Sequence, residues 1–308
     1  RGGVHPFHGG EEDWSEVFEK EGARRGRVGG GQEGEGTTLR AFIVFADPFS
    51  TPVVELMEAW SRTFPEAPVI GGMASGMRAA GHARLALDEH IFAHGAVGVA
   101  LSGEVEVDCV VSQGCRPIGE TFVITRCKGN VIEGLDGKPA LVAIDEMLTG
   151  LSLHDRQLIA TGGLLVGRVI DEGKGNYGRG DFLIRSLVGV RRETGSILIG
   201  DMVRTGQTVQ FQVRDGKSAT EEMRLLLEGE TILAAAPAGV LLITCHARGT
   251  RLFEMPHHDV TLARQVLGDV PVAGFFAAGE LGPVGDRNFI HGHTAALALF
   301  RAPAADGQ

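Results

Sequence analysis

The chain has few aromatic residues and an excess of negative charge. It contains one Tyr and two Trp, and its 29 Lys and Arg residues are outnumbered by 39 Asp and Glu, which gives a net charge of −10. Proteins bind nucleic acids and anionic membranes mainly by neutralising phosphates with Lys and Arg. The composition therefore argues against a nucleic-acid partner and against binding to an anionic membrane.

Cysteine is also scarce. The four cysteines show no CxxC pairing and lie in apolar, strand-like runs. Structural zinc sites usually have closely spaced ligand pairs, and disulfide frameworks are typical of small, cysteine-dense secreted domains. We expect free thiols in a reducing compartment, and we expect no cofactor; the residues concerned are Cys109, Cys115, Cys127 and Cys245.

No hydrophobic run is long enough to predict membrane insertion. The apolar stretch from Thr231 to Ala247 is interrupted by Pro237 and Gly239, and a membrane-spanning helix needs about 20 apolar residues. No secretory signal is recognisable, so we expect an intracellular protein, most simply cytoplasmic. Because the sequence opens at Arg1 rather than Met, a removed transit peptide would make a plastid or mitochondrion the alternative.

Glycine, by contrast, is abundant, with 46 residues in a chain of 308. This length favours two domains or one large domain with two halves. Residues 1–38 are polar and Gly-rich and predict an irregular lead-in. The remaining chain is divided into a domain over 39–150 and a domain over 151–308.

One glycine-punctuated segment occurs twice. "PVIGGMASG" at 68–76 matches "PVAGFFAAG" at 271–279, with Pro, Val, Gly, Ala and Gly in register. Each copy is preceded by a short apolar strand and an amphipathic helix, and each is followed by a further strand. In the second copy Asp259 is the expected N-cap of the helix. We infer two pseudo-equivalent α/β halves whose glycine turns meet and line one cleft.

The segment between the copies has a different pattern. Alternating apolar and polar residues around "GDFLIRSLVGV" and "GQTVQFQVRD" predict antiparallel strands joined by hairpins. The fold class is therefore α/β in the mixed α+β sense, with mixed and antiparallel sheets.

Several motifs imitate catalytic or binding signatures. "GKGNYG" at 173–178 fits the dinucleotide-binding pattern, but a strand rather than a helix follows it, which favours a hairpin loop. Ser75 in "MASGM" lacks the first glycine of a nucleophile elbow.

His291 and His293 could share one side of a strand and bind a metal with Glu280, although hydrogen-bonded structural histidines are more common. Arg116, in a loop, could clamp a ligand carboxylate or form an ion pair.

In the order "FADPFS", "PVIGGMASG", "VVSQGCRPIGE", "GDFLIR", "CHARGTRLF" and "GFFAAGELGPVGDRNFIHGHTA", the chain resembles the FIST family over residues 39–302. That family pairs an N-terminal with a C-terminal FIST domain in prokaryotic signal-transduction proteins and in a eukaryotic F-box protein. The resemblance implies an intracellular sensory module, proposed in the family to bind small ligands, with amino acids among the candidates. No F-box-like segment lies before residue 39, so the resemblance does not imply a ubiquitin-ligase role.

The resemblance carries no catalytic set, so we expect a non-enzymatic module. Its ligand would be an amino acid or an organic acid, and a protein partner is expected because no output domain follows residue 302. A scaffold docked on a larger assembly and a metal-dependent enzyme are the alternatives. Polarity and loop position select the candidate ligand-binding residues Gly72, Ser75, Gly76, Arg116, His246, Arg248, Glu280, Asn288, His291 and His293.

Overall fold

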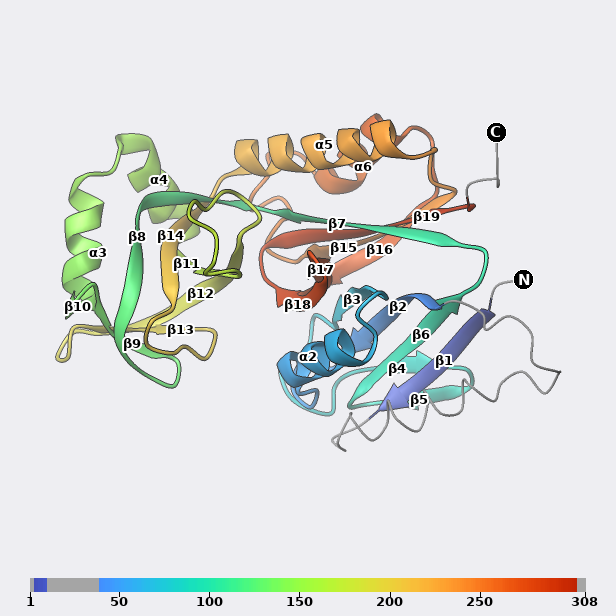
Figure 1. Cartoon of the computed structure of the whole chain (residues 1–308), viewed down its shortest axis with the longest axis horizontal. Coiled ribbons are helices and arrows are strands. Elements are labelled where there is room, and N and C mark those ends of the chain that lie inside the picture. Colours follow the sequence, from blue (N-terminus) through green and yellow to red (C-terminus); the bar gives the residue numbers. More distant parts are fainter. Residues whose placement is uncertain (1–2, 10–38, 304–308) are drawn as a thin grey trace. The chain divides into compact units, whose positions relative to one another are not determined.

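The computed structural model describes residues 3–9 and 39–303 and divides the chain into two compact units. The first unit consists of Arg1–Val111, Arg224–Gly249 and Met255–Gln308, and the second of Ser112–Met223 with Thr250–Glu254. Residue 150, where the sequence suggested a domain boundary, lies inside the second unit. Figure 1 shows the elements of both units.

The first unit contains a six-stranded mixed sheet. Its strand order is β1-β6-β2-β3-β17-β18. The lead-in expected to be irregular contributes a strand to it, because residues 3–9 pair antiparallel with β6; residues 10–38 lie outside the described part of the chain. The strands are β1 (Gly3–Gly9), β6 (Ala96–Ser102), β2 (Leu39–Ala46), β3 (Val69–Met73), β17 (Glu280–Val284) and β18 (Arg287–His291).

The first unit also contains a four-stranded sheet, and a short hairpin that lies beside β6 of the six-stranded sheet. Its order is β16-β15-β19-β7, from β16 (Val272–Ala277), β15 (Gly239–Cys245), β19 (Thr294–Arg301) and β7 (Glu106–Gln113), and the hairpin is β4 (Leu85–Leu87) with β5 (His90–Phe92).

The two sheets contain the duplication that the sequence predicts. In the first copy β2 leads through α2 (Val53–Thr63) to the parallel strand β3, and β6 returns antiparallel to β2. In the second copy β15 leads through α6 (His258–Leu267) to the parallel strand β16, and β19 returns antiparallel to β15. The predicted fold class, mixed α+β with pseudo-repeated halves, is confirmed.

The matching glycines have the same structural role in both copies. Gly71 pairs with Val44, and Gly274 pairs with Leu242. A Cβ at Gly71 would lie 1.8 Å from the Val44 carbonyl oxygen, and a Cβ at Gly274 would lie 1.7 Å from that of Leu242. Both glycines therefore lie within strands and allow the neighbouring strand to approach where no side chain fits.

The two copies pack directly against each other. Equivalent positions make equivalent contacts: a Cβ at Gly72 would lie 2.8 Å from Ile243 Cγ2, and the rings of Phe45 and Phe275 lie 5.5 Å apart. The glycine segments also hydrogen-bond, because Met73 N donates to Gly279 O at 2.8 Å. The expected meeting of the two segments is thus observed, as backbone contact.

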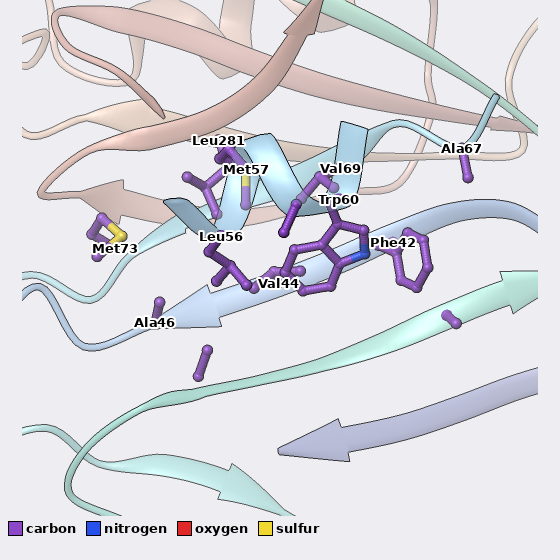
Figure 2. Close-up of a cluster of buried hydrophobic side chains, with 13 residues drawn as sticks. Phe42, Val44, Ala46, Leu56, Met57, Trp60, Ala67, Val69, Met73 and Leu281 are labelled. Carbon is purple, nitrogen blue, oxygen red and sulfur yellow. The ribbon is translucent and has the colours of Figure 1, made fainter. Parts of the chain in front are cut away.

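Helix α2 covers one face of the six-stranded sheet. Its apolar side chains Leu56, Met57 and Trp60 are buried, because they recur on one side of the helix. Figure 2 shows Trp60 next to Phe42 and Val44 of β2, whereas Met57 lies on the side of the cluster where Leu281 is found. The Trp60 ring meets Phe42 edge-on at 5.2 Å between centroids. Thr51, two residues before the helix, donates its hydroxyl to Gly95 O at 2.9 Å.

The second unit is built on a seven-stranded sheet of order β10-β9-β13-β12-β11-β14-β8. Ile132, Ile197 and Phe211 are among the side chains of its main core, against which side chains of α3 and α4 pack. The elements are β8 (Cys115–Lys128), β9 (Val131–Leu135), β10 (Lys138–Pro139), α3 (Ala140–Thr149), α4 (Leu153–Gly162), β11 (Leu165–Val169), β12 (Phe182–Arg191), β13 (Ser196–Ile199) and β14 (Thr208–Arg214).

Helix α5 (Gly216–Leu233) follows β14 and continues past the boundary at residue 223 into the first unit. Within the described residues, no helix combines the length and the apolar character needed to cross a lipid bilayer.

Candidate functional site

A cluster of buried polar side chains lies where the parallel strands β15 and β16 end. Cys245 is the last residue of β15, Glu280 begins β17 and Thr294 begins β19. In open α/β sheets, ligands bind beyond the carboxyl ends of parallel strands, where loops from several strands converge. We call Cys245, Arg248, Asp259, Glu280 and Thr294 the β15-end cluster.

Glu280 is the most unusual residue of this cluster, because its side chain is completely buried. One oxygen, Oε2, accepts hydrogen bonds from the Thr294 hydroxyl at 2.8 Å and from the Thr294 amide at 3.2 Å. The other, Oε1, is shielded from solvent, and no N–H or O–H group in the described residues donates to it. Burial raises the pKa of Glu280 to about 7, although the hydrogen bonds from Thr294 and the Cys245 thiol and the charge of Arg248 act in the opposite direction.

The Cys245 thiol is the neighbour of this carboxyl group. Burial, together with the charge of Glu280, raises the pKa of Cys245 to about 11, while the backbone amides of Ala247 and His293 oppose the shift. At neutral pH the thiol is therefore protonated, and it can serve as a weak donor. None of the four cysteines forms a disulfide, as the sequence predicted.

Arg248 and Asp259 form a buried ion pair next to Cys245. The guanidinium donates to both carboxylate oxygens, from Nε at 2.8 Å and from Nη2 at 2.9 Å. Thr244 donates to the same carboxylate at 2.7 Å, and these partners hold the pKa of Asp259 well below its usual range. Asp259 is therefore not the N-cap of α6, which is His257; it anchors the loop after β15 to the helix.

Three exposed residues lie close to the end of β15, and we call Ser75, His246 and Phe276 the rim. His246 follows Cys245 and is exposed, and its Nδ1 lies 3.1 Å from Ala277 O. Ser75 donates its hydroxyl to Phe276 O, which joins the first copy to the second. The Phe276 side chain is 51% exposed although it is aromatic. This rim joins residues of both glycine segments.

The two glycines predicted for the site have different surroundings. Gly72 is packed against Ile243 and Ala277, where a Cβ would lie within 3 Å of either side chain. Gly76 has a φ of +80° and open space around it. Gly72 therefore serves packing between the copies, whereas Gly76 serves the turn that carries Ser75.

His291, His293 and Asn288 contribute to the frame of the first unit. The His291 ring lies 3.0 Å from Gly282 O, and the amide oxygen of Asn288 accepts from Val69 N at 2.8 Å. His291 ends β18, whereas His293 has a φ of 64° in the following turn, so the two do not share a strand as the metal hypothesis assumed. Within the described residues, no group of three or more His, Cys, Asp and Glu is arranged to hold a metal ion.

Arg116 belongs to the second unit and is engaged by two carboxylates. Its Nε donates to Asp215 at 3.0 Å, and its Nη2 donates to Asp155. These bonds raise the pKa of Arg116 against the effect of burial and lower the pKa of Asp155. The sequence allowed two roles for Arg116, clamping a ligand carboxylate or forming an ion pair. The structure shows Arg116 in ion pairs with Asp155 and Asp215.

The first copy has a buried carboxylate at the position equivalent to Cys245. Counting from the paired residues Val44 and Leu242, Asp47 occupies the place of Cys245. Asp47 is completely buried, and Ser50 donates to its Oδ2 at 2.6 Å. Its Oδ1 is shielded and has no hydrogen-bond partner in the described residues. Sequence analysis missed this residue, although superposing the two copies from their glycines would have found it.

Comparison with known proteins matches the chain to two domain models and to mycobacterial relatives. A model described as the FIST N domain matches residues 6–138, and one described as the FIST C domain matches residues 140–283. Uncharacterized protein Rv0628c of Mycobacterium tuberculosis (strain ATCC 25618 / H37Rv) is 44% identical over 259 residues, which are 84% of this chain and 67% of that protein. Uncharacterized protein Mb0898c of Mycobacterium bovis (strain ATCC BAA-935 / AF2122/97) matches with the same identity and coverage.

Proposed function

The chain belongs to the FIST family, whose domains are associated with sensory modules of signal transduction, and from this premise we propose that it binds a small amino-group-containing ligand at the β15-end cluster. Amino acids are the first class to test. The proposed role is binding rather than catalysis, and the protein partner expected from the sequence stays a prediction.

The observation that carries this proposal is the oxygen Oε1 of Glu280. A buried carboxylate oxygen without an N–H or O–H donor costs about 1–3 kcal/mol or more, because a neighbouring thiol is only a weak donor. An ammonium group supplies a strong donor and the compensating charge. The position at the ends of two parallel strands is one where ligands commonly bind. Because Glu280 is fully buried, entry of the ligand requires local movement of the residues that cover it.

Ligand binding at Glu280 would be linked to proton release. The carboxyl group has its pKa raised to about 7, and a bound ammonium would favour the ionised form and lower that pKa. Near pH 7, part of the Glu280 population would therefore lose a proton when the ligand binds. Calorimetry in buffers with different ionisation enthalpies measures this release.

The test begins with a thermal-shift screen of amino acids, followed by calorimetry of the best ligand. Glu280→Gln keeps the size of the side chain but removes the charge, and we expect it to weaken binding at least about tenfold, one charge-assisted hydrogen bond being worth roughly 1.5–3 kcal/mol. Glu228→Gln, at an exposed position of α5, is the matched control and should bind as the wild type does. No saturable binding across the screen, or unchanged binding by the Glu280 variant, would refute the proposal.

A further inference from the structure

The second unit contains a pair of arginines on neighbouring strands that share one carboxylate. Arg168 of β11 pairs with Leu183 of β12, so Arg185, two residues further, lies on the same face of the sheet as Arg168. Asp201, just after β13, accepts from Arg185 Nε at 2.8 Å through its Oδ2. The same oxygen lies 3.4 Å from Arg168 Nη2.

This sharing leaves Arg168 poorly neutralised. The second oxygen of Asp201 accepts from the Met202 amide at 2.8 Å and is engaged there. Arg168 Nε is shielded from solvent and has no acceptor among the described residues. A guanidinium cannot lose its proton, and a shielded N–H group without an acceptor is costly. The site therefore offers positive charge and an N–H donor that the described residues do not satisfy.

Arg185 is also affected by the excess of positive charge at this site. The Arg185 side chain is 10% exposed, and burial lowers its pKa, with the positive charge of Arg168 acting in the same direction and Asp201 opposing. The Arg168 side chain is 23% exposed, so part of it reaches solvent. The pair thus combines a buried arginine with a partly exposed one.

We propose that Arg168, supported by Arg185, binds a small oxyanion, which is the carboxylate or phosphate group of a ligand. Planar guanidinium groups match the geometry of both anions and are more suited to them than to a spherical ion. Asp201 competes with the anion for the same N–H groups. This site lies in the second unit and is independent of the ligand proposed for the β15-end cluster.

The experiment uses the full chain with inorganic phosphate and acetate as separate probes and chloride as the ionic-strength control. Saturable changes in the arginine Nε–H signals by NMR are expected for at least one oxyanion and not for chloride. The stronger probe identifies the class, since phosphate alone indicates a phosphorylated ligand and acetate alone indicates an organic acid. Equal and unsaturable responses to all three ions would overturn the proposal.

Substitutions separate binding from a purely structural role. Arg168→Gln should weaken oxyanion binding at least tenfold, whereas Arg192→Gln, at an exposed position of the second unit, should leave it unchanged. Asp201→Asn removes the competing charge and should strengthen binding severalfold. If Arg168→Gln does not fold, the Asp201 variant decides the question: weaker or unchanged oxyanion binding there refutes the site.

Discussion

At the scale of single residues, the ionisation of Glu280 links pH to stability. The carboxyl group is fully buried and accepts hydrogen bonds from Thr294, yet burial raises its pKa to about 7 from an ordinary value of 4.5. Between about pH 4.5 and 7, Glu280 is therefore mostly protonated in the folded state and mostly ionised in the unfolded state. The stability contributed by this proton is complete below about pH 4.5 and is lost as the pH rises to about 7.

We predict that Glu280→Gln removes this part of the pH dependence. The free energy of unfolding of the wild type, minus that of the variant, should fall by up to about 3 kcal/mol between pH 4.5 and 7.5, at roughly 1.4 kcal/mol per pKa unit. Urea denaturation at several pH values measures the difference, in which the other titrating groups cancel. A difference that stays constant with pH would contradict the raised pKa.

Sequence patterns identify some residues of the cluster and miss others for physical reasons. Arg248 and Glu280 were predicted as polar residues in or beside loops and were found together. Cys245 ends an apolar strand and is indistinguishable there from a core residue. Asp259 lies in the first turn of a helix. An acidic residue at that place looks the same in the sequence whether it caps the helix or pairs with an arginine elsewhere in the chain.

At the scale of elements, the pairing of β2 with β3 and of β15 with β16 depends on Gly71 and Gly274. Each lies where a Cβ would overlap a carbonyl oxygen of the adjacent strand. This close approach of the adjacent strand explains why both segments have glycine at the equivalent position. The sequence revealed the repetition, while its cause became visible only in the strand register.

We predict that Gly71→Ala and Gly274→Ala each lower the free energy of unfolding by at least about 3 kcal/mol, because backbone cannot move aside as a flexible side chain can. Gly229→Ala is the control: that position is in α5, and a Cβ there would contact nothing within 4 Å. It should stabilise by about 0.5–1 kcal/mol. Urea denaturation distinguishes these cases, and wild-type stability of either strand variant would disprove the role assigned to these glycines.

Most of the longer strands and helices followed from periodicity, whereas their ends and several elements, strand β1 and the hairpin β4–β5 among them, did not. Residues 3–9 carry two glycines and a proline and lack the apolar alternation of a strand, yet they pair with β6. Such a strand forms because an adjacent edge offers backbone partners, which is information from tertiary structure.

At the scale of the whole molecule, the chain forms two units with separate cores. Met57 is buried in the first unit at 2% exposure, and Phe211 is fully buried in the second. Segment composition predicted two halves, but it did not predict that the first unit contains both copies while the second is formed mainly by residues between them. Strand pairing between distant segments determines this division, and it leaves no local signal.

We predict that the two cores respond separately to cavity-forming substitutions. Phe211→Ala should cost about 3–5 kcal/mol and Met57→Ala about 2–5 kcal/mol, each lowering the temperature of one calorimetric transition. Differential scanning calorimetry of both variants and the wild type provides the comparison. If either substitution shifted all of the unfolding signal together, the units would unfold as one.

The pairing of β3 with β17 can form only late in the synthesis of the chain, because β17 is made long after β3. Gly72 pairs with Glu280, and a ribosome adding about 5–20 residues per second needs roughly 10–40 s to make the intervening chain. The second unit can fold during that interval, while the β3 edge that β17 later covers still lacks its partner. Unpaired strand edges associate with other chains, so this edge is where a nascent molecule most needs a chaperone.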